Sequence, residues 1–191
     1  MTGDAVLQEL AQCGALLEGH FVLSSGRHSD RFIQMGVVLQ HPAVAERLCR
    51  ALAGLWGDVE IDTVLGPAMG GVIIAYETAK ALGARALFTE REDGSMRLLR
   101  GFGLRPGERV LVVDDVLTTG GSVRDSIAAV RAGGGQAVGM SVLVHRKSGA
   151  APAFDVPYRR LAEVEAVSFP PADCPLCQRG VAVTDPDKRT I

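Results

Sequence analysis

The sequence has neither a strong excess of one charge nor a long apolar run. Its 191 residues include 20 Lys and Arg and 22 Asp and Glu, which gives a formal net charge of −2 at pH 7. This balance provides no general attraction to nucleic acid or to an anionic membrane. No stretch reaches the roughly 18 consecutive apolar residues of a spanning helix, and the first residues lack a signal-peptide core. We therefore expect a cytoplasmic protein with small-molecule partners, and no nucleic-acid or membrane partner.

Cysteine is also scarce. The four cysteines are Cys13, Cys49, Cys174 and Cys177. A chain that is 47% hydrophobic can bury a full core, so a disulfide framework is unnecessary. The CPLC segment at 174–177 supplies only half of a four-cysteine zinc site, and the other two cysteines fall in predicted helices without a partner pattern. A structural zinc, shared between chains, is an alternative, but we favour reduced thiols without a structural task.

Internal repeats and low-complexity tracts are absent too, and the chain length fits one domain. Apolar periodicity predicts helices at 5–13 and 42–56, so the first sixty residues look largely helical. From residue 61 onward, helices alternate with buried strands. The predicted strands are 61–66, 84–88, 109–114 and 137–144, and the predicted helices are 70–83 and 122–132. This alternation is typical of a parallel sheet covered by helices.

Two segments break this alternation. Residues 89–107 are rich in charge and glycine and have no clean period, which indicates a long mobile loop or a hairpin. Loops of this length are uncommon in compact domains unless they act as lids or binding loops. The tail from Ala150 onward is rich in proline and short apolar pieces, and we expect its last ten residues to be loosely held.

The stretch VLVVDDVLTTGGS, residues 110–122, puts acids and hydroxyls at the end of a predicted strand, where open parallel sheets bind ligands. Its Thr-Thr-Gly-Gly turn and the helix beginning near Ser122 offer N–H groups to a phosphate. Asp114 and Asp115 would repel a phosphate that they touched, so they must serve vicinal hydroxyls or Mg²⁺. The pattern predicts a sugar phosphate as ligand. For an isolated acid pair, a strand-end turn with a capping serine would be the simpler interpretation.

The same stretch resembles the phosphoribosyl pyrophosphate (PRPP) signature of the type I phosphoribosyltransferases. Three more stretches resemble the orotate-specific members of that family, in the family's order. They are FVLSSGRHSDRF (21–32), GPAMGGVIIA (66–75) and VLVHRKSG (142–149). The resemblance implies an α/β fold with a central, mainly parallel sheet flanked by helices and a small hood from the N-terminal region. Residues 1–191 would form one domain, with a hood of about 1–60 plus part of the tail and a core of about 61–165.

The resemblance also implies roles for individual residues. The residues that it assigns to PRPP are Ala68, Met69, Gly70, Gly71, Arg91, Asp114, Asp115, Val116, Leu117, Thr118, Thr119, Gly120, Gly121 and Ser122. Among these, Asp114 and Asp115 hold the ribose hydroxyls and, with Arg91, form the catalytic set. The residues that it assigns to orotate are Phe32, Thr118 and Arg146. An arginine fork is suited to the carboxylate that distinguishes orotate from uracil.

Some positions depart from the family pattern. Many members carry a lysine where this chain has Ser24 and another where it has Gly70. In the 89–107 loop, only Arg91 aligns with one of the family's catalytic lysines, and the possible substitutes for the other cations are Arg97 and Arg100. His20 and His28 accompany the N-terminal motif and are at least as readily interpreted as solvated or capping side chains as ligands. We therefore assign no residue as a metal ligand.

The resemblance implies transfer of the phosphoribosyl group from PRPP to orotate, which gives orotidine 5′-monophosphate and pyrophosphate in UMP biosynthesis. It also implies Mg²⁺ as cofactor and a homodimer in which the 89–107 loop reaches the neighbouring site. Two alternatives remain open. One is a PRPP-dependent transferase for a purine or another base. The other is a PRPP-sensing regulator, which would need a winged helix or a basic face that residues 1–60 do not suggest.

Overall fold

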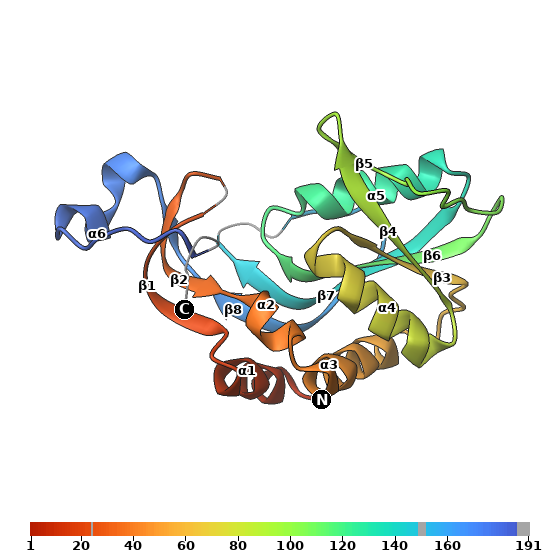
Figure 1. The fold of residues 1–191 in the computed structure, drawn as a ribbon, viewed down its shortest axis with the longest axis horizontal. Helices are drawn as coiled ribbons and strands as arrows, with labels where there is room; N and C mark the ends of the chain where they lie inside the picture. The colour runs from red at the N-terminus through yellow and green to blue at the C-terminus, as the bar shows by residue number, and fades with distance from the viewer. Residues whose placement is uncertain (24, 149–151, 187–191) are drawn as a thin grey trace.

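A six-stranded sheet forms the centre of the molecule (Figure 1). We describe it from a computed structural model that covers residues 1–23, 25–148 and 152–186. The strand order is β5-β4-β3-β6-β7-β8, and all neighbours except β5 and β4 are parallel. The strands are β3 (Thr63–Pro67), β4 (Arg85–Glu92), β5 (Ser95–Arg97), β6 (Arg109–Leu117), β7 (Gln136–Lys147) and β8 (Tyr158–Glu165). The predicted mainly parallel sheet is confirmed.

Helices cover both faces of this sheet because adjacent strand residues point to opposite sides. In β3, Val64 belongs to one buried apolar cluster and Leu65 to the other, and each neighbouring strand divides in the same way. One cluster includes residues of α1 (Gly3–Gln12), α2 (Met35–Leu39), α3 (Pro42–Gly54) and α4 (Gly70–Leu82). The other includes residues of α5 (Gly121–Ala132). The predicted helices are therefore present, and each of their ends lies within two residues of its predicted position.

A second, smaller sheet forms a hood beside the core. It contains β1 (Leu16–Val22), β2 (His28–Ile33) and β9 (Ser168–Phe169), paired antiparallel in the order β1-β2-β9. The expectation that the first sixty residues are largely helical is wrong here, because an antiparallel hairpin separates α1 from α2. The two strands of the hairpin pair with each other, and β2 also pairs with β9 near the C-terminus, which local periodicity does not reveal.

The tail is more structured than its proline content indicates. Residues 158–165 form β8 at the edge of the main sheet, followed by a 3-10 turn η1 (Pro171–Asp173) and a short helix α6 (Pro175–Gln178). The N–H of Thr184 donates to the carbonyl of His20 at 2.7 Å, so the expectation of loosely held last residues is wrong at this position. That expectation covers residues 182–191, of which 187–191 lie outside the described part of the chain.

The segment 89–107 begins as a hairpin, one of the two predicted forms. Strand β4 extends to Glu92 and turns back into β5, with Arg91 paired to Met96. Figure 1 shows this hairpin projecting from the body of the core. Within the described ranges, no helix is long and apolar enough to cross a bilayer.

Candidate active site

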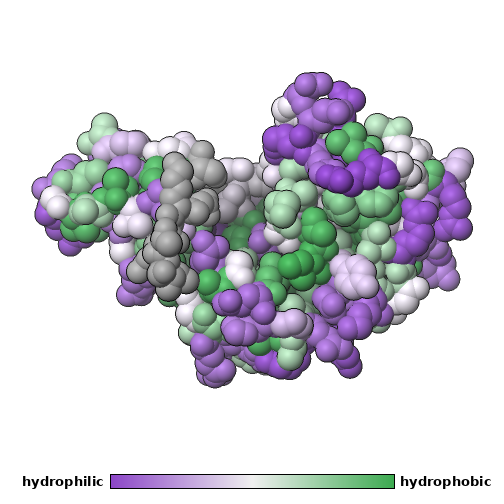
Figure 2. Space-filling model, in the orientation of Figure 1, coloured by the Kyte–Doolittle hydropathy of each residue, from purple (hydrophilic) through white to green (hydrophobic). Residues whose placement is uncertain are grey.

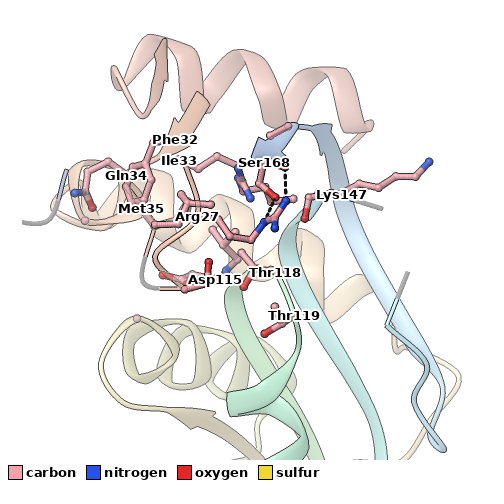
Figure 3. Close-up of a pocket in the computed structure, with 18 of the residues that line it drawn as sticks. Arg27, Phe32, Ile33, Gln34, Met35, Asp115, Thr118, Thr119, Lys147 and Ser168 are labelled. Carbon is pink, nitrogen blue, oxygen red and sulfur yellow. Dashed lines mark hydrogen bonds between the residues drawn. The ribbon is translucent and has the colours of Figure 1, made fainter. Parts of the chain in front are cut away.

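A cleft of about 1600 Å³ lies between the hood and the carboxyl ends of the core strands. Figure 2 shows the hollow between these two parts, and Figure 3 shows side chains from both pointing into it. The hood contributes Arg27, Phe32 and Gln34. The core contributes Asp115 and Thr118 from the signature stretch, together with the loop before α4. Segments that lie far apart in sequence thus share one cavity.

The acid pair sits within the last part of β6 rather than after it. The strand continues to Leu117, which pairs with His145 of β7, so it is three residues longer than the sequence predicts. The N–H of Asp115 donates to Asp114 Oδ1 at 2.9 Å, and the N–H of Val116 donates to Asp115 Oδ1 at 2.6 Å. Burial raises the pKa of both carboxyls, and the charge of Asp115 raises the pKa of Asp114 further. The pair therefore favours partners that donate hydrogen bonds or carry positive charge.

The turn after the acids has the properties of an anion site. Thr118 and Thr119 are exposed and line the cleft. Gly120 is the N-cap of α5, has φ +77° and provides no side-chain capping bond, so the first N–H groups of the helix receive no cap from it. A Cβ at Gly120 would lie 2.8 Å from Phe154 Cζ, and L side chains disfavour this φ, so the position requires glycine.

The loop between β3 and α4 is closely packed. A Cβ at Gly66 would lie 2.1 Å from the carbonyl oxygen of Gly71, so the chain turns from strand to helix without side chains between them. Met69 and Gly70 of this loop line the cleft, and Ala68 and Gly71 flank them. A Cβ at Gly70 would lie 2.2 Å from Asp115 Oδ2, so this glycine allows the carboxylate to contact the loop directly. The loop and the acid pair therefore form one continuous surface.

Arg146 is a buried cation at the base of the cleft. It is only 4% exposed, and one terminal nitrogen donates to Ser29 Oγ at 2.7 Å. Its Nε has no hydrogen-bond partner among the described residues. Burial lowers the pKa of this guanidinium, and the charge of Asp30 only partly opposes the effect. A buried guanidinium with an unused donor is suited to bind an anionic ligand group.

Phe32 lies across the cleft from the acid pair (Figure 3). Its ring is tilted against Phe21, with 5.9 Å between centroids. The structure thus brings Phe32, Arg146 and Thr118, the three residues assigned to orotate, into one cavity.

Arg91 lies outside the cleft lining. Its guanidinium is 3.6 Å from Asp125 Oδ2 and 3.5 Å from Ser122 Oγ, and it also donates to the carbonyl of Gly94. This places it beside the start of α5 in its own chain. The two possible substitutes have carboxylate partners: Arg97 is 3.4 Å from Glu92, and Arg100 binds both oxygens of Glu90.

The sequence assignment omitted several residues of the cleft. Arg27 donates to Ser168 Oγ and to the Ser168 carbonyl, which fixes it at the rim (Figure 3). Lys147 also lines the cleft and lies within 3.7 Å of Glu163. Arg27 and Lys147 lie within the stretches 21–32 and 142–149, which resemble the orotate-specific family members. Their place in these stretches is the sequence feature that could have identified them as cleft residues. Ser24, where many family members carry a lysine, lies outside the described residues.

Comparisons with known proteins agree with this geometry. The family model for the phosphoribosyl transferase domain matches residues 35–172. The orotate phosphoribosyltransferase of Pelotomaculum thermopropionicum is 51% identical, with 100% of both chains covered. The crystal structure of orotate phosphoribosyltransferase from Aeropyrum pernix is 31% identical with a TM-score of 0.67, and covers 83% of this chain and 93% of its own. The UMP synthase of Leishmania donovani shares the fold, with a TM-score of 0.72 and 22% identity over 84% of this chain and 36% of that longer chain. From these matches and its cleft, the chain belongs to the orotate phosphoribosyltransferase family.

Proposed function

We propose that the protein transfers the phosphoribosyl group of PRPP to orotate, releasing pyrophosphate and forming orotidine 5′-monophosphate for pyrimidine biosynthesis. The observation that carries this proposal is the convergence on one cleft of an anion-binding turn, an acid pair and a buried arginine whose Nε has no partner among the described residues. Each feature matches one part of the reactants: the 5-phosphate, the ribose hydroxyls and the carboxylate of orotate.

The reaction requires electrostatic help more than a protein nucleophile. As the bond from C1 to pyrophosphate breaks, positive charge grows on the ribose ring and negative charge grows on the leaving group. Asp114 and Asp115 would hold the ribose hydroxyls and stabilise the positive charge on the ring. The N–H groups of the Ala68–Gly71 loop would hold the pyrophosphate, and Arg146 would orient orotate for attack.

We also propose Mg²⁺ as the cofactor. Neighbouring carboxylates are the hard oxygen ligands that this ion prefers, so Asp114 and Asp115 fit it. A cation would also relieve the burial and repulsion that raise the pKa of this pair. When bound, Mg²⁺ would offset negative charge on the departing pyrophosphate.

We propose further that the enzyme acts in the cytoplasm as a homodimer. Ile73 and Tyr76 of α4 are 42% and 64% exposed, and Met69, the N-cap of this helix, is 85% exposed and continues their helical spacing. Figure 2 shows apolar surface over the first part of this helix. Exposed apolar side chains gathered in this way are typical of a protein interface. The β4–β5 hairpin projects from the core and would carry Arg91 to the pyrophosphate of the neighbouring site.

Subunit mixing tests the dimer and the origin of Arg91 together. Arg91→Ala and Asp115→Asn subunits, each inactive alone, would regain activity when mixed, because one site of each mixed dimer has an intact strand end and an intact visiting hairpin. Random exchange makes about half of the dimers mixed, so roughly a quarter of wild-type activity should return. Absence of recovery after demonstrated exchange would place Arg91 in its own subunit's site, where it contacts Ser122 here.

A competition assay tests the choice of base. With PRPP and Mg²⁺, a mixture of orotate, uracil, hypoxanthine and guanine should lose orotate alone, because only orotate has the carboxylate that Arg146 can bind bidentately. Consumption of a purine with orotate untouched would reject the proposed substrate and favour a purine transferase on the same fold.

A further inference from the structure

Four potential metal ligands meet on the hood, away from the cleft lining. They are His20 of β1, His28 of β2, Cys174 before α6 and Cys177 within it. One ligand atom from each lies within 4.8 Å of the other three. Cys174 and Cys177 have the C-x2-C spacing of a zinc knuckle. The structure therefore supplies the second half of the site that the sequence left incomplete.

Three of the separations between these atoms match those of a tetrahedral zinc centre with two cysteine and two histidine ligands, and none of them exceeds 4.8 Å. Zinc bonds of about 2.3 Å to sulfur and 2.0–2.1 Å to nitrogen imply ligand separations of about 3.3–3.8 Å. His20 Nε2 lies 3.5 Å from Cys174 Sγ and 3.8 Å from Cys177 Sγ. His28 Nδ1 lies 3.3 Å from Cys177 Sγ and 2.9 Å from His20 Nε2. Small side-chain rotations would bring all four atoms to one ion.

The surroundings of His20 also fit a ligand. Its Nδ1 lies 2.7 Å from the carbonyl oxygen of Val181, and a carbonyl can only accept, so Nδ1 carries the hydrogen. In the neutral ring, the lone pair then sits on Nε2, the atom that faces the other three residues. A carbonyl in this position commonly fixes the tautomer of a zinc-bound histidine. His20 is 3% exposed and Cys174 is fully buried, so much of the cluster is shielded from water.

We propose that His20, His28, Cys174 and Cys177 bind one structural Zn²⁺ that fastens the C-terminal segment to the hood hairpin. Two thiolates and two neutral imidazoles balance the charge of the ion, and four protein ligands fill its tetrahedral shell without an open position for catalysis. Figure 1 shows the segment with α6 extending beyond β1 and β2, away from the main core. A metal cross-link compensates for the small apolar core that such an extension can build.

The zinc would also support the cleft indirectly. His28 pairs with Phe169 in the hood sheet, and its neighbour Ser29 accepts the hydrogen bond from Arg146. On the same tail segment, Ser168 accepts hydrogen bonds from Arg27 at the rim. Because the cluster lies outside the cleft lining, zinc would be required for hood stability and not for the chemical step.

The test measures metal on tag-free protein purified under reducing conditions without chelator. We expect about one zinc per chain by plasma mass spectrometry. Replacement by Co²⁺ should give thiolate charge-transfer absorption and the intense visible bands of a tetrahedral site. Removal of the metal with a chelator should lower the unfolding temperature by about 5 °C or more, and added zinc should restore it.

Two variants make this measurement specific. Cys177→Ser replaces an exposed ligand, so it should fold but lose most of the zinc and the cobalt spectrum while its turnover number stays within about twofold of wild type. Cys13→Ser, in which the thiol follows α1 and lies outside the cluster, is the matched control and should keep both. Folded wild-type protein that neither contains nor takes up zinc would overturn the proposal. A Cys174–Cys177 disulfide in the native protein, or equal zinc in both variants, would overturn it as well.

Discussion

Replacing Arg146 by methionine separates its role in binding from any role in stability. In the folded protein, burial lowers the pKa of the guanidinium, which means that the charged form is less stable there than in water. At every working pH the charge of this residue therefore costs folding free energy. Ser29 does not lose its only partner in the variant, because its Oγ also donates to the carbonyl of Val167 at 2.8 Å. Methionine fills a similar volume without the charge.

The expected effects have opposite directions. Stability should stay equal or rise by about 1 kcal/mol, because a buried charge is exchanged for an apolar side chain. Binding should weaken, because the variant lacks two charge-assisted hydrogen bonds to the orotate carboxylate, each contributing about 1.5–2 kcal/mol. The total of about 3–4 kcal/mol corresponds to a loss of roughly 10²- to 10³-fold in kcat/KM for orotate.

Steady-state kinetics and urea unfolding of the same preparation check this reasoning. The KM for PRPP should change by less than about threefold, because we propose that Arg146 binds only the base. Arg146→Lys, which keeps the charge without the fork, should fall between wild type and Arg146→Met. If Arg146→Met loses stability in proportion to its activity, or raises both Michaelis constants equally, Arg146 is a structural residue and the assignment fails.

Three other perturbations follow from the cleft. Asp115→Asn should reduce turnover by about 10²-fold or more without lowering the free energy of unfolding, because burial raises the pKa of this carboxyl and its charge therefore destabilises the native state. A loss of stability that matches the loss of turnover would contradict this. Folding raises the pKa of Asp114, so its contribution to stability is full below the unfolded pKa of about 4 and is lost as pH rises through the folded value. In urea titrations without Mg²⁺, the free energy of unfolding of Asp114→Asn should thus equal that of wild type near pH 3.5 and exceed it at pH 8. Parallel pH profiles for the two proteins would refute this. Gly66→Ala should cost about 3 kcal/mol in unfolding free energy because its Cβ meets the backbone of Gly71, whereas Gly54→Ala, which meets open space, should change it by less than about 0.5 kcal/mol.

The parallel core was predictable because its strands are nearly continuous apolar runs. In β3, all five residues from Thr63 to Pro67 are buried, and such a run has few alternatives to a central strand. The strands of the hood and the edge strand β8 have weaker hydrophobic patterns in the sequence. β2 has only two buried residues, Ser29 and Ile33, and β8 has only Ala162, so pairing with a neighbouring strand, more than burial of their own side chains, decides their conformation.

The functional residues also fall into a part that the sequence predicts and a part that it does not. The acid pair and its turn are contiguous, so their chemistry can be recognised from thirteen residues of sequence. The His and Cys cluster joins residues 154 positions apart, His20 and Cys174, and no local pattern links them. Long-range convergence of this kind depends on the hood hairpin, whose strands local periodicity did not predict.

The central claim is that the cleft joins orotate to the phosphoribosyl group of PRPP. The most direct measurement mixes the enzyme with orotate, PRPP and Mg²⁺ and quantifies nucleotide and pyrophosphate by mass spectrometry and a coupled assay. We expect orotidine 5′-monophosphate and pyrophosphate in equal amounts, with little product from Asp115→Asn enzyme that still folds. Tight PRPP binding without nucleotide formation, or pyrophosphate release that does not depend on orotate, would contradict it.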